Sequence, residues 1–375
     1  KFEAIRDRLP LNPEFITTRG PEKACLFWSI VEKGSPSLNR SELGPDDPAV
    51  MIYTAGLTGK PLGAVLTHKN LLSQSILVRD LYHSTEKDRS LAVIPLFHSF
   101  GAAVNMLAAL RIGAGIVLMD HYSVESILKS IARDKVTYIA AVPRLFLGLA
   151  LSPDIANHDI SSLSFCITGG AAMPPEYISA FEQKVPVILR EGYGLTEASP
   201  VCACHRREGI HKPGSISIPI PGAEIKIVDE AGKELPPNTE GELIVKGDNV
   251  MKGYYKDDEA TAQVIKNGWL HTGDLARMDE DGFIFLTGRK KRMIITSGFN
   301  VYPREVEMVL EMHPAVMKAR VVGKQDLMRG EVVKALVVKQ PGDETDGKHI
   351  MKHCRTYLAS YKLPRELEFV EELTD

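Results

Sequence analysis

The sequence has few of the features that would place a protein outside the cell or across a membrane. It has only five cysteines, which are scattered along the chain: Cys25, Cys166, Cys202, Cys204 and Cys354. An odd number without regular spacing favours a reducing cytosol over a disulfide-stabilised fold. The most apolar stretch, residues 101–119, is interrupted by Asn105 and Arg111, so it predicts a buried helix and strand. We therefore expect a cytoplasmic protein without a transmembrane segment, while peripheral membrane contact stays open.

An excess of charge of one sign is also lacking. The chain has 45 basic and 48 acidic residues, a formal net charge of −3. This balance gives no electrostatic reason to expect nucleic acid as a partner. With 375 residues, 44% of them hydrophobic, the chain is long enough for one large core and a smaller domain.

The spacing of a zinc site is missing as well. Cys202-Ala203-Cys204-His205 superficially resembles half of such a site. No second pair of ligands follows at a fitting distance, which disfavours zinc at these residues.

The sequence does have a glycine-rich segment, YTAGLTGKPLGAVLTH, at residues 53–68. Glycines let backbone N–H groups approach a ligand closely, and threonines add hydroxyl donors, so the segment suits the oxygens of a polyphosphate. It is not a P-loop, because that motif would need glycine at Thr54 and serine or threonine at Pro61. The alternative is a plain turn between a strand and a helix.

Helix-like and strand-like segments alternate over residues 70–200. Helical spacing occurs at 71–81 and 124–132, and β-rich runs occur at 90–94, 115–119, 136–142, 163–168 and 185–190. This succession predicts an α/β fold with a doubly wound, mainly parallel sheet.

Shorter strand patterns begin near residue 213. Strands are predicted at 223–228 and 243–245, and a hairpin at 275–286 turns at Asp279–Gly282. Beyond Arg292, a helix starting at Pro303, strands at 319–322 and 332–338 and a helix at 349–360 predict a compact α+β unit.

Six segments together carry a family resemblance. They are YTAGLTGKPLG (53–63), PLFHSFG (95–101), GGAAMPPE (169–176), EGYGLTEASP (191–200), GWLHTGDL (268–275) and GRKKRMIITSGFNVYPREVE (288–307). In order and spacing they resemble the adenylate-forming superfamily, which includes acyl-CoA synthetases, luciferases and peptide-synthetase adenylation domains. The likeness is tightest to medium- and long-chain fatty acyl-CoA synthetases, through NVMKGYY (249–255), SGFNVYPREVE (297–307) and RGEVVKALVV (329–338).

The resemblance implies a domain organisation. Residues 1–291 correspond to part of a large AMP-binding domain, with the α/β layer at about 45–212 and a small β-barrel-like subdomain at 213–288. Residues 292–375 correspond to a mobile C-terminal domain that hinges at Arg292. Family members carry a longer N-terminal segment and a catalytic lysine beyond the residues present here. The likeness therefore implies a fragment that is nearly inactive by itself.

The implied reaction has two steps. A carboxylic acid, here a fatty acid, attacks the α-phosphorus of ATP and gives acyl-AMP and pyrophosphate. The thiol of coenzyme A then attacks the acyl-AMP. The β- and γ-phosphates correspond to the glycine-rich loop, through Thr54, Gly56, Thr58, Gly59 and Lys60.

The other site residues also follow from the resemblance. Thr196 and Glu197 correspond to groups at the α-phosphate, with Glu197 as a ligand of Mg²⁺, although the same pair is also common as a helix cap. The resemblance implies an adenine site formed by Gly169, Gly170, Ala171, Gly192, Tyr193 and Gly194. It also implies that Asp274 and Arg289 bind the ribose and that Gly298 lines the pantetheine channel. His98 corresponds to a gate beside the acyl carboxylate, and Phe100, Gly101, Ala102 and Ala103 fit either an acyl tunnel or ordinary core packing.

The glycine-rich loop departs from the family pattern at three positions. Ala55 replaces a serine, Leu57 a serine or threonine, and Leu62 a lysine, while every glycine is kept. A lost charge-assisted contact predicts adenylation slower by roughly ten- to a hundredfold.

Two alternatives to a fatty acyl-CoA synthetase stay open. An acyl-AMP ligase that loads a carrier protein typically has an insertion before its last domain, and none is visible between Arg289 and Asn300. A non-catalytic nucleotide-binding relative is the other, because the loop is altered.

Overall fold

The computed structural model describes residues 33–34, 42–54, 61–290 and 293–373. The chain forms two compact units, residues 1–44 and 45–375, and the description below concerns the second. Several predicted positions lie outside the described residues: Cys25, Ala55, Gly56, Leu57, Thr58, Gly59, Lys60 and Arg292. The boundary expected between residues 291 and 292 lies outside them too and stays a prediction.

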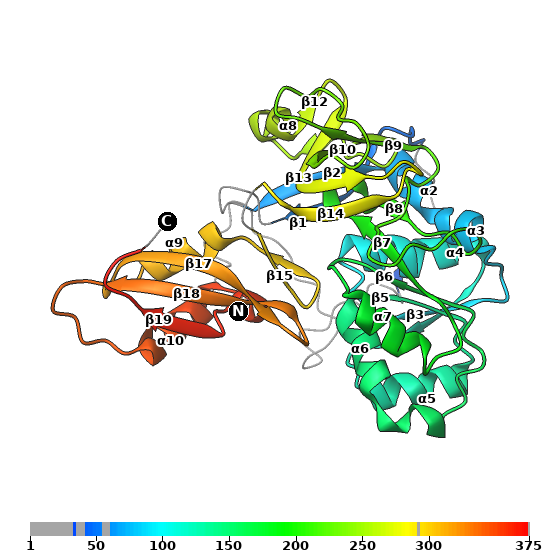
Figure 1. Ribbon diagram of the computed structural model, residues 1–375, viewed down its shortest axis with the longest axis horizontal. Helices are drawn as coiled ribbons and strands as arrows, with labels where there is room; N and C mark the ends of the chain where they lie inside the picture. Colours follow the sequence, from blue (N-terminus) through cyan, green and yellow to red (C-terminus); the bar gives the residue numbers. More distant parts are fainter. Residues whose placement is uncertain (1–32, 35–41, 55–60, 291–292, 374–375) are drawn as a thin grey trace. The chain divides into compact units, whose positions relative to one another are not determined.

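A six-stranded sheet forms the centre of the fold (Figure 1), with the order β4-β3-β5-β6-β7-β8. Its strands are β3 (Arg89–Ala92), β4 (Gly115–Leu118), β5 (Tyr138–Ala141), β6 (Phe165–Thr168), β7 (Leu189–Gly194) and β8 (Val201–Cys204). All neighbours are parallel except β7 and β8. The prediction for the fifth strand, residues 185–190, was four residues early, because Pro186 has no N–H group for the sheet ladder.

Helices flank this sheet in two groups. The first comprises α2 (His68–Ser75), α3 (Leu77–Tyr82) and α4 (Ala108–Ile112), and the second α5 (Val124–Asp134), α6 (Pro143–Leu151) and α7 (Pro175–Glu182). The apolar stretch 101–119 forms a π-helix (Gly101–Leu107), α4 and β4. The predicted buried helix and the strand are present, but β4 is an edge strand without a buried residue, so the prediction of burial was wrong for the strand. Within the described ranges, no helix is both long and apolar enough to span a bilayer.

Two antiparallel sheets complete this part of the fold, and the first of them contains the strands expected after residue 213. One contains β9 (Ala223–Val228), β10 (Gly241–Gly247), β12 (Ile265–Lys266), β13 (Trp269–Met278) and β14 (Ile284–Arg289). The predicted hairpin is confirmed, because β13 and β14 pair across residues 279–283. The other sheet contains β1 (Pro48–Thr54), β2 (Leu62–Thr67) and β11 (Gly253–Tyr254), followed by helix α8 (Asp258–Val264). The glycine-rich segment therefore joins two antiparallel strands, and a turn between a strand and a helix is excluded.

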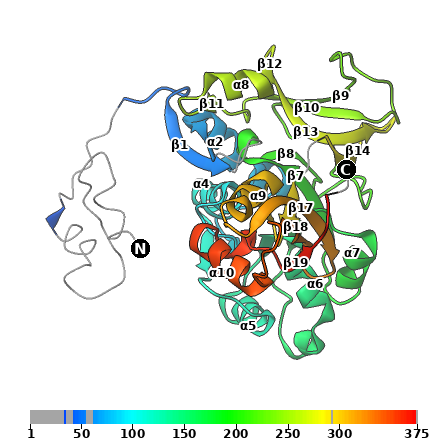
Figure 2. The ribbon, with the colours of Figure 1, turned by 90° about the vertical axis from the view of Figure 1, so that its left-hand side faces the viewer.

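The C-terminal part has its own sheet and its own apolar core. The sheet runs β16-β15-β18-β17, with β19 beside β18, and consists of β15 (Ile294–Thr296), β16 (Phe299–Val301), β17 (Val316–Asp326), β18 (Gly330–Lys339) and β19 (Glu366–Phe369). Helix α9 (Pro303–Glu311) packs against β17 and against α10 (Gly347–Tyr357), as Figure 2 shows. Pro303 is the first helical residue, as predicted, and Val306 and Leu310 are fully buried. The predicted α/β fold with a smaller β subdomain and an α+β C-terminal domain is confirmed.

Candidate active site

A cavity lies at the carboxyl edge of the parallel strands. Residues 95–101 follow β3, Gly169 follows β6, and Thr196 follows β7. The carboxyl ends of parallel strands meet at one edge of a sheet, which is the usual place for a ligand in such folds. The cavity has an empty volume of about 840 Å³ and is partly open to solvent. His98, Gly169, Tyr193 and Thr196, predicted from three separate motifs, line it together.

Three side chains from different motifs form a buried polar network beside the cavity. The Tyr193 hydroxyl donates to Asp274 Oδ2 over 2.5 Å, and Arg289 Nε pairs with Asp274 Oδ1 over 2.8 Å. Asp274 and Arg289 stand opposite each other on β13 and β14. Arg289 Nη1 is buried and has no hydrogen-bond partner among the described residues. The network thus presents a fixed carboxylate and one open guanidinium donor.

The segment of β13 that carries Asp274 is held by Glu242 of β10. Sequence analysis assigned no role to Glu242. Glu242 Oε1 accepts from the Gly273 N–H at 3.2 Å. Its Oε2 contacts His271 Nδ1 at 2.9 Å and Lys290 Nζ at 3.1 Å. Burial opposes the charged form of Glu242, but the bonds from His271 and Lys290 outweigh it and lower the pKa of the carboxyl. No local pattern marks Glu242, because it lies 29 or more residues from these partners.

Glu197 lies in the 3₁₀ turn Thr196–Ala198, and its side chain is buried. The Tyr254 hydroxyl donates to Glu197 Oε1 over 2.9 Å, and the Met251 N–H donates to its carbonyl over 2.8 Å. Burial raises the pKa of Glu197. Thr54 Oγ1 is buried without a partner in the described residues. Thr196 makes no side-chain cap, so the alternative of a helix-capping pair is wrong.

At Gly194 and Gly298, another part of the chain lies too close for a larger side chain. A Cβ at Gly194 would collide with the carbonyl oxygen of Pro200, to which the Leu195 N–H donates. Gly298 has φ +84°, and a Cβ there would collide with Val142 at the start of α6. Gly298 therefore lies against the cavity wall, which it lines with Asn300.

His98 lies at the mouth of the same cavity. Its Nδ1 accepts from the Phe100 N–H at 3.1 Å, and burial lowers its pKa, so the neutral ring carries its hydrogen on Nε2. The ring is edge-on to Phe299, with centroids 6.2 Å apart, and Phe299 stacks on Tyr361 at 4.6 Å.

The other end of the cavity is largely apolar. Its wall is formed from α2, α3 and the π-helix by Gln74, Leu77, Val78, Leu81, Tyr82 and Val104. Of the four residues considered for an acyl tunnel, Phe100 lines the cavity. Gly101, Ala102 and Ala103 do not line it, and a Cβ at Gly101 would meet the carbonyl oxygens of Ile94 and Pro95. For Gly101 and Ala103, which are buried, core packing is the correct interpretation, whereas Ala102 is only partly buried.

Known proteins resemble the chain in sequence and structure. The AMP-binding enzyme family matches residues 10–255, and the AMP-binding enzyme C-terminal domain matches residues 305–375. The chain is 40% identical over 330 residues to a long-chain-fatty-acid–CoA ligase of Bacillus subtilis, covering 87% of this chain and 59% of that protein. It is 36% identical over 332 residues to a feruloyl-CoA synthase of an Amycolatopsis species, covering 88% and 67%.

A solved structure, the amide bond synthetase McbA from Marinactinospora thermotolerans, superposes with a TM-score of 0.90 at 30% identity. The match covers 99% of this chain and 74% of that one. The chain spans about three fifths of the length of the Bacillus subtilis relative. With both family domains matched in order, the chain belongs to the AMP-binding enzymes, the adenylate-forming superfamily that its six motifs resemble.

Proposed function

We propose that this chain is the main part of an AMP-forming acid–thiol ligase, which converts a fatty acid, ATP and coenzyme A into acyl-CoA, AMP and pyrophosphate in the cytoplasm. The observation that carries the proposal is the Tyr193–Asp274–Arg289 network beside an apolar cavity. Its carboxylate is fixed from two sides, and Arg289 keeps a buried, open donor. A polar ligand that supplies hydroxyl donors and an acceptor would satisfy this network, and a ribose does so.

The remaining roles are assigned by position. Gly169, Gly170 and Tyr193 would lie along the adenine, and Thr54 Oγ1, a buried hydroxyl without a partner, would bind a phosphate oxygen. His98 would place its Nε2 hydrogen toward the acid, and Gly298 would line the path of the thiol. These groups position the reactants, which is the main contribution of a protein to phosphoryl chemistry.

The residues present also fit a magnesium ion. Glu197 is buried, its charged form is disfavoured there, and a cation beside the carboxylate would offset that cost. Mg²⁺ prefers one or two carboxylates and completes its shell with phosphate oxygens and water. When bound, the ion neutralises charge on the phosphates. Glu197 would hold it, with Thr196 at the adjoining phosphate oxygen.

The acid is proposed to be aliphatic and of medium or long chain. The cavity wall on α3 consists of aliphatic and aromatic side chains, as is usual for sites that bind apolar ligands. A larger side chain at position 78 would block the cavity, because Val78 lines the cavity and is only 2% exposed.

The test uses stable acyl-sulfamoyl-adenosines, analogues of acyl-AMP, measured by calorimetry from acetyl to hexadecanoyl, with a feruloyl analogue included. We expect the tightest binding for a medium or long acyl group. Val78→Trp should weaken the hexadecanoyl analogue at least about tenfold and leave the acetyl analogue unchanged. The matched control is Leu72→Trp on the exposed side of α2. No binding of any analogue would reject the function, and a preference for the feruloyl analogue would reject the fatty acid.

A further inference from the structure

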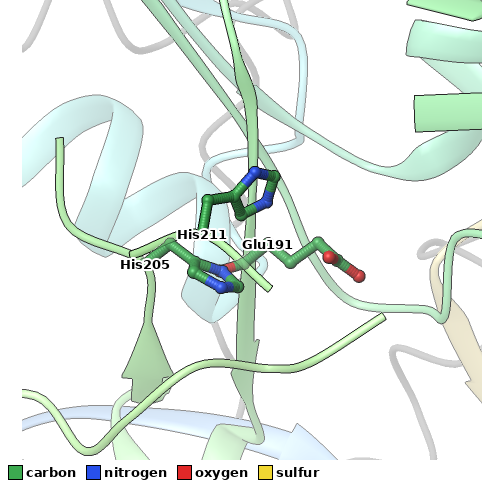
Figure 3. Close-up of side chains that lie close together, drawn as sticks. All are labelled: Glu191, His205 and His211. Atoms are coloured by element: carbon green, nitrogen blue, oxygen red, sulfur yellow. The ribbon is translucent and has the colours of Figure 1, made fainter. Parts of the chain in front are cut away.

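Three side chains with metal-ligating atoms converge on the strand that also carries Tyr193. Glu191 lies on β7, His205 directly follows β8, and His211 lies in the next loop (Figure 3). One ligand atom from each lies within 4.8 Å of the other two. The two imidazole rings are nearly perpendicular, with centroids 4.6 Å apart. One residue separates Glu191 from Tyr193 of the proposed adenine site, so the cluster is close to the proposed active site but outside its cavity lining.

The hydrogen bonds of His205 fix which ring nitrogen is free. Its backbone N–H donates to the Glu191 carbonyl at 3.0 Å, and its Nδ1 lies 3.2 Å from the same oxygen. A carbonyl oxygen only accepts, so Nδ1 carries the hydrogen and Nε2 carries the lone pair. Histidines that bind metals through Nε2 usually donate Nδ1–H to a carbonyl or carboxylate in this way.

The free nitrogens have no partner in the described residues. His205 is 1% exposed, and both its Nε2 and that of His211 are buried without a hydrogen bond. Burial lowers the pKa of both rings, that of His205 to about 4, so both are neutral ligands at physiological pH. Leaving such groups unpaired is costly, which indicates that something bridges them.

Glu191 supplies the third ligand. Burial raises the pKa of its carboxyl to about 7, and a cation between the two rings would favour the charged form. Glu191 is 8% exposed, and its Oε2 accepts from the Gly214 N–H at 2.9 Å, which orients the carboxylate. The Arg190 guanidinium lowers the pKa of both rings and would repel a cation, and the carboxylate opposes that effect. Without a bound ion, no hydrogen bond joins the carboxylate to either ring among the described contacts.

We propose that Glu191, His205 and His211 bind one divalent transition-metal ion, with Zn²⁺ as the best chemical match. Two neutral imidazoles and one carboxylate leave a fourth position for water, which suits the tetrahedral preference of zinc. The cysteines that suggested zinc in the sequence take no part. Cys204 Sγ contacts the Tyr82 hydroxyl at 3.3 Å, and Cys202 Sγ lies 3.8 Å from the Pro200 carbonyl. The sequence analysis disfavoured zinc at residues 202–205, and the site proposed here takes only His205 from that segment.

The ion would stabilise the loop of residues 206–214 against β7. It would also fix the end of β8, where the His205 carbonyl accepts from the Tyr82 hydroxyl at 2.6 Å. Tyr82 lines the apolar end of the cavity. The site therefore connects a metal to the shape of the acid pocket without contacting the acid.

The test measures binding of Zn²⁺ to the chelator-treated 375-residue chain by calorimetry, and binding of Co²⁺ by its visible d–d absorption. We expect one equivalent, an absorption intensity typical of four- or five-coordinate Co²⁺, and a thermal midpoint that rises with Zn²⁺. His211→Ala and Glu191→Gln should each weaken binding at least about tenfold. His211 is only partly buried, so its replacement leaves the core intact.

The matched control is His353→Ala. His353 also faces a second histidine, His313, with ring centroids 5.2 Å apart, but its Nε2 already lies 3.0 Å from the Val309 carbonyl. This variant should bind Zn²⁺ like the parent. Absence of stoichiometric binding, or binding that survives in His211→Ala and disappears in His353→Ala, would overturn the proposal.

Discussion

Two polar clusters share strand β7, and they differ in how their hydrogen-bonding groups are satisfied. At the end of the strand, both oxygens of Asp274 have donors, from Tyr193 and Arg289. Two residues earlier, Glu191 meets two imidazole rings whose Nε2 atoms are buried without a hydrogen-bond partner among the described residues. The first cluster is rigid before any ligand arrives and offers directed donors and acceptors, as an organic ligand requires. The second lacks only a positive centre, as a metal site does.

Asp274→Ala should have the largest effect and tests whether the first cluster depends on the paired carboxylate. The change leaves the Arg289 cation buried without its partner, which typically costs about 3–5 kcal/mol of unfolding free energy. We also expect the acyl-AMP analogue to bind roughly a hundredfold more weakly, because two charge-assisted bonds are lost at about 1.5–3 kcal/mol each. Urea unfolding and calorimetry measure the two effects. Asp274→Asn, which keeps the shape, should retain more stability than Asp274→Ala. Equal losses would mean that the lost charge accounts for the whole effect, and an Asn variant as stable as the parent would show that the charge is unimportant.

Leu62→Lys tests whether position 62 faces the phosphates of the proposed ATP site. Leu62 stands opposite Thr54, whose hydroxyl is unpaired, and it packs on the apolar cluster of Ala64 and Tyr254. A lysine there adds the cation that related loops carry, so we expect ATP·Mg²⁺ to bind severalfold more tightly, or pyrophosphate exchange to rise by that factor. Leu62→Met is the control for packing. Unchanged kinetics and affinity would show that the position faces the apolar cluster and not phosphate.

Glu191→Gln tests the other cluster in metal-free protein. Glutamine keeps an acceptor for the Gly214 N–H and removes a buried carboxylate that no cation pairs among the described residues. We therefore expect the free energy of unfolding to change by less than about 1 kcal/mol, or to increase, in contrast to Asp274→Ala. A loss of several kcal/mol in chelator-treated protein would show that the cluster is already satisfied without a metal.

The smallest effect concerns two histidines with opposite tautomers. His98 Nδ1 accepts a backbone N–H, whereas His205 Nδ1 donates to a carbonyl. Burial lowers the pKa of His98, so below its ordinary pKa the unfolded chain binds a proton that the folded chain does not. Stability should therefore fall as the pH drops below about 6.5, and His98→Gln should flatten that part of the curve. Identical profiles of unfolding against pH in the two proteins would contradict this.

Sequence reasoning was accurate where the signal is local. The hairpin turn at residues 279–282 and the helix start at Pro303 depend on a few adjacent residues, and both lie where predicted. The start of β7 was misplaced because apolar character at 185–190 outweighed the missing N–H of Pro186. Tyr193, Thr196, Asp274 and His98 were assigned roles because motifs mark them. Tyr254, Tyr82 and Glu242 were not assigned roles, because nothing near them in the chain signals a contact.

The order of six motifs determined the family, and the alternation of helix-like and strand-like segments over residues 70–200 predicted the α/β fold. Three of the motifs, at residues 95–101, 169–176 and 191–200, lie at the carboxyl edge of the six-stranded sheet. Only the tertiary structure decided which groups are satisfied. Glu191, His205 and His211 are separated by turns of the chain, and it is pairing of β7 with β8 that brings them together. A hydrogen bond or a free lone pair depends on distances of a few tenths of an ångström and on burial, which residue order alone does not specify.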